Sequence, residues 1–273
     1  MFLPPPVHWS FDPIAFSIGP LAVHWYGICW GLAFFCADAV VRRMLRSIGR
    51  DDVDVGALIA CALFGTIVGA RLAHCFFYDP QFYLAHPLKI FAIWEGGMAS
   101  HGGAAGLIVA LAWGAPRYAP GLPLLTLLDA TTISAAIGGA VIRGANFLNS
   151  EILGNPTDGS WGVIFDRIDP LPRIPVQLFE AAAYIVIAAL LLLAHRWAKA
   201  LTRPGTMTGL FLALVFGARA VLETWKTPQA AYESGGGLSV GQWLSVPFVV
   251  LGVALVARAL ARPPTTWPRR AGA

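Results

Sequence analysis

Hydrophobic residues occur along this chain in seven long runs, which shorter polar segments separate. Each run is close to the roughly 20 residues that an α-helix needs to cross the hydrocarbon core of a bilayer. We therefore predict an all-α polytopic integral membrane protein in which residues 1–273 form a single domain. The predicted membrane-spanning helices cover residues 21–41, 56–75, 98–114, 123–142, 176–194, 206–224 and 241–261.

The connections between these runs differ in character. Residues 76–97 are rich in aromatic residues and proline, which suits a segment that lies at the membrane interface. Residues 149–175 contain Gly, Pro and Asp turn signals, and we predict that they form a small cap outside the membrane. Residues 228–239 contain a run of glycines, so we expect a flexible loop that can move over a cavity.

Composition and charge exclude a soluble domain and suggest an orientation in the membrane. Hydrophobic residues make up 57% of the chain, charged residues only 12%, and the mean hydropathy is +0.65. The net charge of +4 is spread over the loops, which favours orientation signals over nucleic-acid binding. Twelve of the 19 Lys and Arg residues fall on one side of the predicted helices. That side is predicted to be cytoplasmic, with the N-terminus outside and the C-terminus inside.

The N-terminus and the cysteines suggest no processing and no metal. The first residues lack the basic start of a cleavable signal peptide, so we expect them to stay in the mature chain. The cysteines include no CxxC pair and lie in or beside apolar runs, where we expect small core residues rather than disulfides or metal ligands. These cysteines are Cys29, Cys36, Cys61 and Cys75.

The segment 139–154 is the most unusual polar feature, because it places charged and amide groups at the end of an apolar run. Such groups are costly at membrane depth unless they are paired or face water, so they usually have a function. On an extended helix Arg143, Asn146 and Glu151 would lie near one face. The alternative is an intramembrane ion pair that only holds neighbouring helices together.

Two further groups contain aromatic or imidazole side chains. Tyr26, in the sequence His-Trp-Tyr-Gly, can donate a hydrogen bond from an apolar wall, although such a pair is also typical of an aromatic-belt anchor. His101 enters a predicted span among glycines, and its ordinary pKa near 6.5 makes it a candidate proton acceptor. A glycine-rich packing face with a satisfied histidine is the alternative for this segment.

The remaining polar groups lie at the ends of predicted spans. Gln177 and Glu180 enter one span three residues apart, where an acidic residue is also typical of a helix start. Arg219 and Glu223 are four residues apart on one helical face, a spacing that also suits a structural pair. Gln242 begins the last span, and no role is assigned to Asp129.

The predicted topology places most of these groups in the external half of the membrane, so one shared polar chamber is the simplest interpretation. Two arginines in a chamber suit a phosphate, because each guanidinium group is permanently charged and can bind two phosphate oxygens at once. We therefore expect an anionic lipid of the outer leaflet as the ligand. The chamber would contain Tyr26, His101, Arg143, Asn146, Glu151, Gln177, Arg219, Glu223 and Gln242.

The order of these motifs resembles the bacterial phosphatidylglycerol:prolipoprotein diacylglyceryl transferases. The run from Arg143 to Gly154 is similar to the signature of that family, and five other motifs follow the same order over most of the chain. They begin at His24, Gly96, Gln177, Arg219 and Ser239. The chain departs from the usual family pattern at Ile142, Ala104, Ala105, Arg173, Ile174, Phe179 and Lys226.

The resemblance implies transfer of the diacylglyceryl group of phosphatidylglycerol to the lipobox cysteine of a prolipoprotein, in a bacterial cytoplasmic (inner) membrane and at its outer leaflet. It implies no metal or organic cofactor. His101 would be the general base, while Arg143 and Arg219 would stabilise the phosphate; alternatively, Arg143 is the main catalytic group and His101 is structural. The substrate-binding residues would be Tyr26, Asn146, Asn149, Glu151, Gly154, Gln177 and Glu223.

Two other classes of protein share part of this pattern. A lipid or anion transporter would also place arginines in a membrane chamber, but it should have a polar path to the cytoplasmic side, where the spans show little polarity. A non-catalytic membrane scaffold would use the same charged pairs to hold its helices together.

Overall fold

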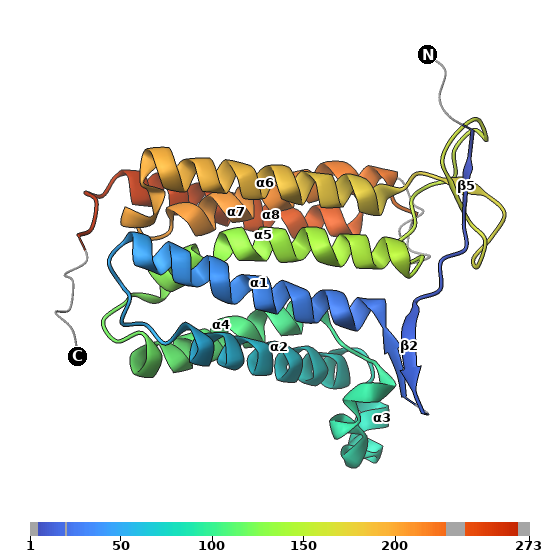
Figure 1. The fold of residues 1–273 in the computed structure, drawn as a ribbon, viewed down its shortest axis with the longest axis horizontal. Helices are drawn as coiled ribbons and strands as arrows, with labels where there is room; N and C mark the ends of the chain where they lie inside the picture. Colours follow the sequence, from blue (N-terminus) through green and yellow to red (C-terminus); the bar gives the residue numbers. More distant parts are fainter. Residues whose placement is uncertain (1–4, 20, 228–237, 267–273) are drawn as a thin grey trace. The chain divides into compact units, whose positions relative to one another are not determined.

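The computed structural model describes residues 5–19, 21–227 and 238–266 (Figure 1). The chain divides into two compact units, which are described separately. The first contains the described residues up to 40 and from 128 onward, and the second contains residues 41–127. Most of the predicted glycine-rich loop at 228–239 lies outside the described residues.

The long helices correspond to the predicted apolar runs. Five of them are long and apolar enough to cross a membrane, namely α2, α5, α6, α7 and α8. The protein is therefore largely helical and has five candidate membrane spans in its described part. The long helices are α1 (Trp25–Ser47), α2 (Val55–Phe77), α4 (Ser100–Tyr118), α5 (Leu124–Leu148), α6 (Val176–Ala198), α7 (Thr206–Leu222) and α8 (Val240–Leu260).

Helix α5 is longer than predicted, because it continues six residues beyond the expected end at 142. The additional residues contain neither glycine nor proline after Gly144, so nothing in the sequence stops the helix there. Arg143 and Asn146 consequently lie on the last turns of α5, whereas Glu151 follows the helix. Ser150 and Ile152, on either side of Glu151, adopt positive φ angles of 58° and 55°, which turn the chain sharply.

The first unit also contains five short strands that the sequence did not predict. Strand β1 (Val7–Trp9) pairs in parallel with β4 (Val163–Phe165), and β5 (Pro172–Arg173) pairs antiparallel with β4. The N-terminal residues thereby join the segment 149–175, which is called the cap below. A separate hairpin consists of β2 (Ile14–Ile18) and β3 (Leu21–His24).

Aromatic side chains attach this sheet to α5. The centroids of the Trp9 and Phe147 rings lie 4.6 Å apart. The Phe147 ring contacts the Phe165 ring edge-on, with 5.6 Å between the ring centroids. Phe165 is completely buried. Buried aromatic pairs of this kind contribute about 0.5–1.5 kcal/mol beyond their buried area, so the cap is fixed to the end of α5 that carries Arg143.

Asp129, which had no predicted role, fixes the beginning of α7. Its fully buried carboxylate accepts hydrogen bonds from the backbone N–H groups of Gly205 and Thr208, both at 2.7 Å. It also accepts the Thr208 hydroxyl at 2.6 Å. The first N–H groups of a helix have no partner within the helix and carry partial positive charge, so a carboxylate from α5 satisfies both needs.

In the second unit, α2 and α4 cross at glycines. A Cβ atom on Gly69 would lie 2.4 Å from the carbonyl oxygen of Gly102, and one on Gly65 would lie 2.5 Å from that of Gly106. Glycine spaced four residues apart on both helices lets the two backbones touch. This contact fixes the first turn of α4, which carries His101.

Arg71 organises the rest of the second unit. Among the described side chains and backbone groups, this buried arginine of α2 donates to backbone carbonyl oxygens of the following loop. The loop contains α3 (Pro80–Ala85) and the 3-10 turns η1 (Pro87–Phe91) and η2 (Ile93–Glu95), whose exposed apolar side chains include Leu88 and Trp94. The accepting residues are Lys89, Ile90, Ala92, Gly96 and Gly97.

We expect Gly69→Ala to destabilise the protein in detergent by about 1–3 kcal/mol, because the new methyl group would overpack the α2–α4 contact. Thermal unfolding measures the effect. Gly31→Ala in α1 is the matched control, since a Cβ atom there would meet nothing within 4 Å. A Gly69→Ala protein as stable as the Gly31→Ala protein would contradict this account of the crossing.

Candidate functional site

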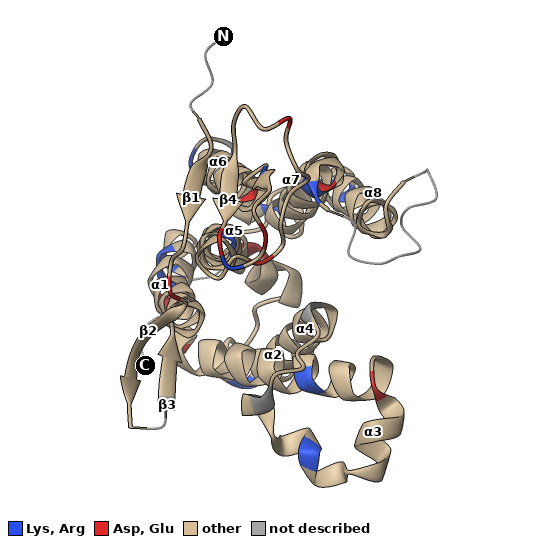
Figure 2. Ribbon diagram, turned by 90° about the vertical axis from the view of Figure 1, so that its right-hand side faces the viewer, with Lys and Arg blue, Asp and Glu red and all other residues tan. Residues whose placement is uncertain are grey.

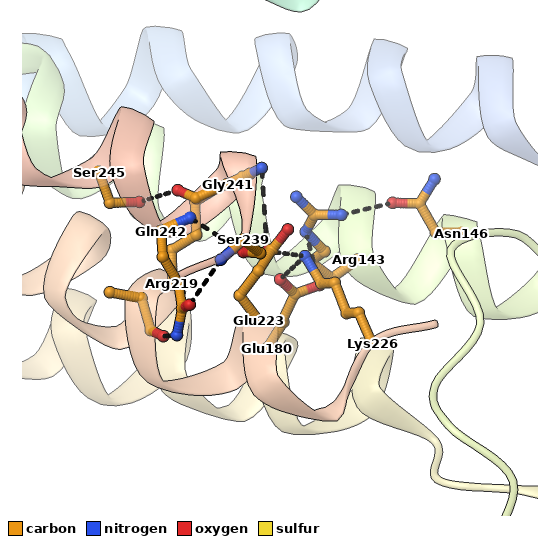
Figure 3. A network of polar contacts seen from close by, with 11 residues as sticks. Arg143, Asn146, Glu180, Arg219, Glu223, Lys226, Ser239, Gly241, Gln242 and Ser245 are labelled. Carbon is orange, nitrogen blue, oxygen red and sulfur yellow. Dashed lines mark hydrogen bonds and ion pairs between the residues drawn. The ribbon is translucent and has the colours of Figure 1, made fainter. Parts of the chain in front are cut away.

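Glu180 is the centre of a charged network in the first unit (Figure 3). Its carboxylate is only 4% exposed and lies on the second turn of α6. One oxygen lies 3.2 Å from Nε of Arg143 on α5, and the other lies 2.8 Å from Nζ of Lys226. A buried carboxylate needs such partners, because an unpaired charge costs several kcal/mol away from water.

Lys226 connects Glu180 to a second carboxylate. Its side chain is 7% exposed, and its ammonium group also contacts Glu223 at 3.1 Å. Glu223 follows α7 in the 3-10 turn η4 (Glu223–Trp225) and lies 4.0 Å from Arg219, one helical turn earlier. Arg219 is the most accessible cation of the network, with 36% of its side chain exposed.

The ends of several helices place these side chains together. Figure 2 shows the coloured Lys, Arg, Asp and Glu segments close to one another near α5, α6 and α7. Helix α8 completes the site through a capping box, in which Ser239 and Gln242 bond each other's backbone N–H groups, while the Gln242 amide donates to the Ala220 carbonyl. Gly241 must be small, because a Cβ atom there would lie 2.2 Å from a Glu223 carboxylate oxygen.

A chain of amides extends the network beyond the end of α5. The Arg143 guanidinium donates to the side-chain oxygen Oδ1 of Asn146 at 3.4 Å, and the Asn146 side-chain NH₂ donates to the Glu151 carboxylate at 3.1 Å. Asn149 donates to the other Glu151 oxygen at 3.2 Å. The fully buried Gln177 donates to the Glu151 backbone carbonyl at 2.6 Å. Glu151 itself is exposed, so the network reaches solvent at its carboxylate.

Gly154 closes the cap by its backbone alone. Gly154 pairs with Lys226 in an isolated antiparallel β-bridge. Its backbone carbonyl oxygen accepts hydrogen bonds from the Arg173 guanidinium and the Thr227 hydroxyl. A Cβ atom on Gly154 would lie 2.2 Å from the Ile174 carbonyl oxygen, so only glycine fits. Gly154 therefore keeps Lys226 beside the cap.

Arg173 is held in turn by an acidic residue of the cap. The Asp169 carboxylate contacts the Arg173 guanidinium at 2.5 Å, in a geometry that uses both carboxylate oxygens. Hydrogen bonding to Arg173 lowers the pKa of Asp169 below its ordinary value. The pair therefore stays charged throughout the neutral range and keeps Arg173 on the Gly154 carbonyl.

A small, partly open pocket lies beside the network, with both arginines in its wall. The five side chains joined by ion pairs comprise three cations and two carboxylates, which leaves one net positive charge. Glu151 is one hydrogen bond further away, at Asn146. This arrangement suits an amphipathic anion, whose charge would contact the arginines and whose apolar part would contact the hydrocarbon side chains of the lining. The lining includes Arg143, Glu180, Tyr184, Val215, Arg219 and Leu222.

The structure brings most of the predicted site residues together, and it leaves two outside the network. His101 is exposed on the first turn of α4 in the second unit. Tyr26 of α1 contacts the Trp30 ring, and its hydroxyl has no polar partner in the described part of the chain. The residues that are joined by direct contacts or through Glu180 and Lys226 are Arg143, Asn146, Asn149, Glu151, Gly154, Gln177, Arg219 and Glu223.

The central carboxylate was not among the predicted site residues. Arg143 pairs with Glu180, and Glu151 reaches it only through Asn146. Glu180 had been explained as a helix-start residue, and Lys226 had been noted only as a departure from the family pattern. Glu180 and Lys226 share one sequence feature that could have indicated a role in the site, namely a charged side chain at the edge of an apolar run.

Comparison with known proteins shows similarity along nearly the whole chain. The sequence model of the family described as prolipoprotein diacylglyceryl transferase matches residues 13–258. A relative from Tolumonas auensis is 51% identical over 248 residues, which cover 91% of this chain and 95% of the relative. A relative from Chloroherpeton thalassium is 43% identical, covering 92% and 93%. A third, from Porphyromonas gingivalis, is 36% identical, covering 97% and 99%. All three are named phosphatidylglycerol–prolipoprotein diacylglyceryl transferase.

We expect Glu180→Gln to lower the free energy of unfolding by about 3–5 kcal/mol, because it leaves two buried cations with one carboxylate fewer. Thermal or denaturant unfolding in detergent measures this loss. Glu151→Gln makes the same chemical change on an exposed carboxylate that accepts only amide N–H groups, so it should cost much less. Equal stability of the two variants would show that Glu180 is not the centre of the network.

Proposed function

Because the chain belongs to the prolipoprotein diacylglyceryl transferase family, we propose that it transfers the diacylglyceryl group of phosphatidylglycerol to the lipobox cysteine of prolipoproteins. The observation that carries this proposal is the pocket whose wall contains Arg143 and Arg219. The two arginines come from different helices and are connected through Glu180, Lys226 and Glu223. This step begins the maturation of bacterial lipoproteins.

We place the protein in the bacterial cytoplasmic (inner) membrane with seven crossings, the N-terminus outside and the C-terminus in the cytoplasm. The five candidate spans support a protein that crosses the membrane several times, and the excess of Lys and Arg on the predicted inner side supports the orientation. In this orientation the ends of α5 and α7 that carry the arginines face outward. The pocket would then open toward the phosphate groups of the outer leaflet, and the segments 76–97 and 149–175 would lie at or outside the interface.

The reaction exchanges one bond for another at carbon. The cysteine sulfur attacks the glyceryl CH₂ carbon that carries the phosphate, a C–S bond forms, and the C–O bond to the phosphate breaks. The bonding electrons remain on the departing phosphate oxygen, so the products are a thioether and glycerol phosphate. The thiol must lose its proton, because the thiolate is the nucleophile and a free cysteine has a pKa near 8.5.

Arg143 and Arg219 stabilise the departing phosphate in this proposal. A dianionic phosphate ester forms as the C–O bond breaks, and fixed guanidinium groups bind that additional charge more strongly than the charge of the lipid. The net positive charge of the network and the partly exposed Arg219 guanidinium support this role. Glu223 and Glu180 orient the two arginines, while no metal or organic cofactor takes part.

The other predicted residues have supporting roles. His101 accepts the thiol proton, and its exposure at the start of α4 leaves it accessible to a substrate. Tyr26 and Asn146 bind the lipid headgroup. Asn149, Glu151 and Gln177 keep Asn146 in place through the contacts described above. Gly154 contributes to substrate binding by fixing the cap beside Lys226.

Incubating the purified protein with phosphatidylglycerol and a lipobox peptide tests the function directly. We expect mass spectrometry to show a peptide whose mass has increased by one diacylglyceryl group, and glycerol phosphate in equal amount. A lipobox peptide with serine in place of cysteine is the control, because a hydroxyl is far less nucleophilic at neutral pH. A folded protein that leaves the cysteine peptide unmodified would refute the proposed function.

We expect His101→Gln to lower kcat by about 10²–10⁴-fold through loss of the base, without weakening lipid binding. Arg143→Ala should lower kcat by at least about 10²-fold and also weaken lipid binding, in a protein that still folds. Turnover and binding of phosphatidylglycerol, measured separately, distinguish the two effects. Unchanged turnover in the His101→Gln protein would eliminate the base and leave Arg143 as the principal catalytic group.

A further inference from the structure

Tyr184 lines the pocket, and neither the sequence nor the proposed mechanism gives it a role. It lies on α6 four residues after Glu180 and three before Ile187, which also lines the pocket. These spacings put all three side chains on one face of the helix. Along this wall the lining changes from a carboxylate to a phenol and then to hydrocarbon.

The opposite wall changes in the same direction. Arg219 of α7 lines the polar end, and Val215, four residues earlier on the same face, lines the apolar end. The charged groups therefore lie toward the ends of the helices and Val215 and Ile187 toward their middles, while Leu222, three residues after Arg219, also lines the pocket. One turn of helix corresponds to about 5.4 Å along its axis, so Tyr184 lies at the level where both walls change from charge to hydrocarbon.

The Tyr184 ring is held in place by close packing. A Cβ atom on Gly139 would lie 2.7 Å from the ring, so the phenol rests directly on the α5 backbone. Gly139 is one turn before Arg143, just as Tyr184 is one turn after Glu180. The side chain is half-buried, and its hydroxyl has no hydrogen-bond partner in the described part of the chain. It is a fixed donor that is available to a ligand.

A glycerophospholipid presents its groups in the same order as the pocket wall. The phosphate comes first, the ester groups follow after a few covalent bonds, and the acyl chains come last. With the phosphate at Arg143 and Arg219, the ester groups reach the level of Tyr184. We propose that the Tyr184 hydroxyl donates a hydrogen bond to an ester carbonyl oxygen of the bound lipid, so that the enzyme distinguishes ester-linked from ether-linked lipids.

This inference rests on the proposed function, and it adds a chemical criterion by which the site selects its lipid. Ether-linked phosphatidylglycerol has the same phosphate, glycerol and chains but lacks the carbonyl oxygens. The transfer step itself is unchanged, because the bond that breaks is the same in both lipids. Any difference between the two lipids therefore reports on recognition of the carbonyl groups.

The test measures KM and kcat for diacyl and dialkyl phosphatidylglycerol of equal chain length, with a lipobox peptide as acceptor and its mass increase as the readout. A net hydrogen bond between neutral groups corresponds to about a 3- to 10-fold change in an equilibrium constant. We expect the unmodified protein to have a KM lower by that factor for the diacyl lipid. Tyr184→Phe should raise the KM for the diacyl lipid to that of the dialkyl lipid and leave kcat unchanged.

Tyr118→Phe in α4 is the matched control, because it removes a phenol hydroxyl from a residue outside the pocket and should change neither KM value. If Tyr184→Phe raises the KM values for both lipids equally, the hydroxyl acts on a group common to both, and the inference is wrong. Equal KM values for the two lipids in the unmodified protein would also refute it. If neither lipid is transferred by folded protein, the proposed function itself fails.

Discussion

A carboxylate that is buried among apolar helices has to be paired, and Glu180 determines how the first unit is arranged. Its two oxygens select one cation from α5 and one from the segment after α7. Because Lys226 also contacts Glu223, the pairing continues to Arg219. The ends of the three helices α5, α6 and α7 are thus joined by ion pairs, and removing Glu180 would leave buried cations without their partner.

In the proposed function, this pairing also prepares the site for its ligand. The two carboxylates are already shared among three cations, so the arginines are held in place before any lipid enters. The remaining positive charge needs little reorganisation to meet a phosphate, and preorganised charge is the main source of electrostatic stabilisation in enzymes. The cap reinforces the arrangement, because Gly154 and Arg173 fix the backbone beside Lys226.

The sequence predicts the helices better than their contacts. Long apolar runs determine where helices form, and the order of motifs identified the family, which the comparisons confirm. The partner of Arg143 was missed because pairing between helices depends on their rotation and relative height, and neither leaves a periodic signal in the sequence. The strands at residues 7–9 and 163–165 were missed because three residues are too few to show alternation. Asp129 had no local partner from which its role on α7 could be inferred.

Helix α7 is attached at both of its ends. At its beginning Asp129 of α5 binds the first backbone N–H groups, and after its last turn Glu223 and Lys226 attach it to Glu180. The position of Arg219 therefore depends on the number of residues between these attachments. Each residue advances a helix by about 1.5 Å and turns it by about 100°. The length of α7 is thus itself a determinant of where the guanidinium lies, and insertions are tolerable only in the loops outside the two attachments.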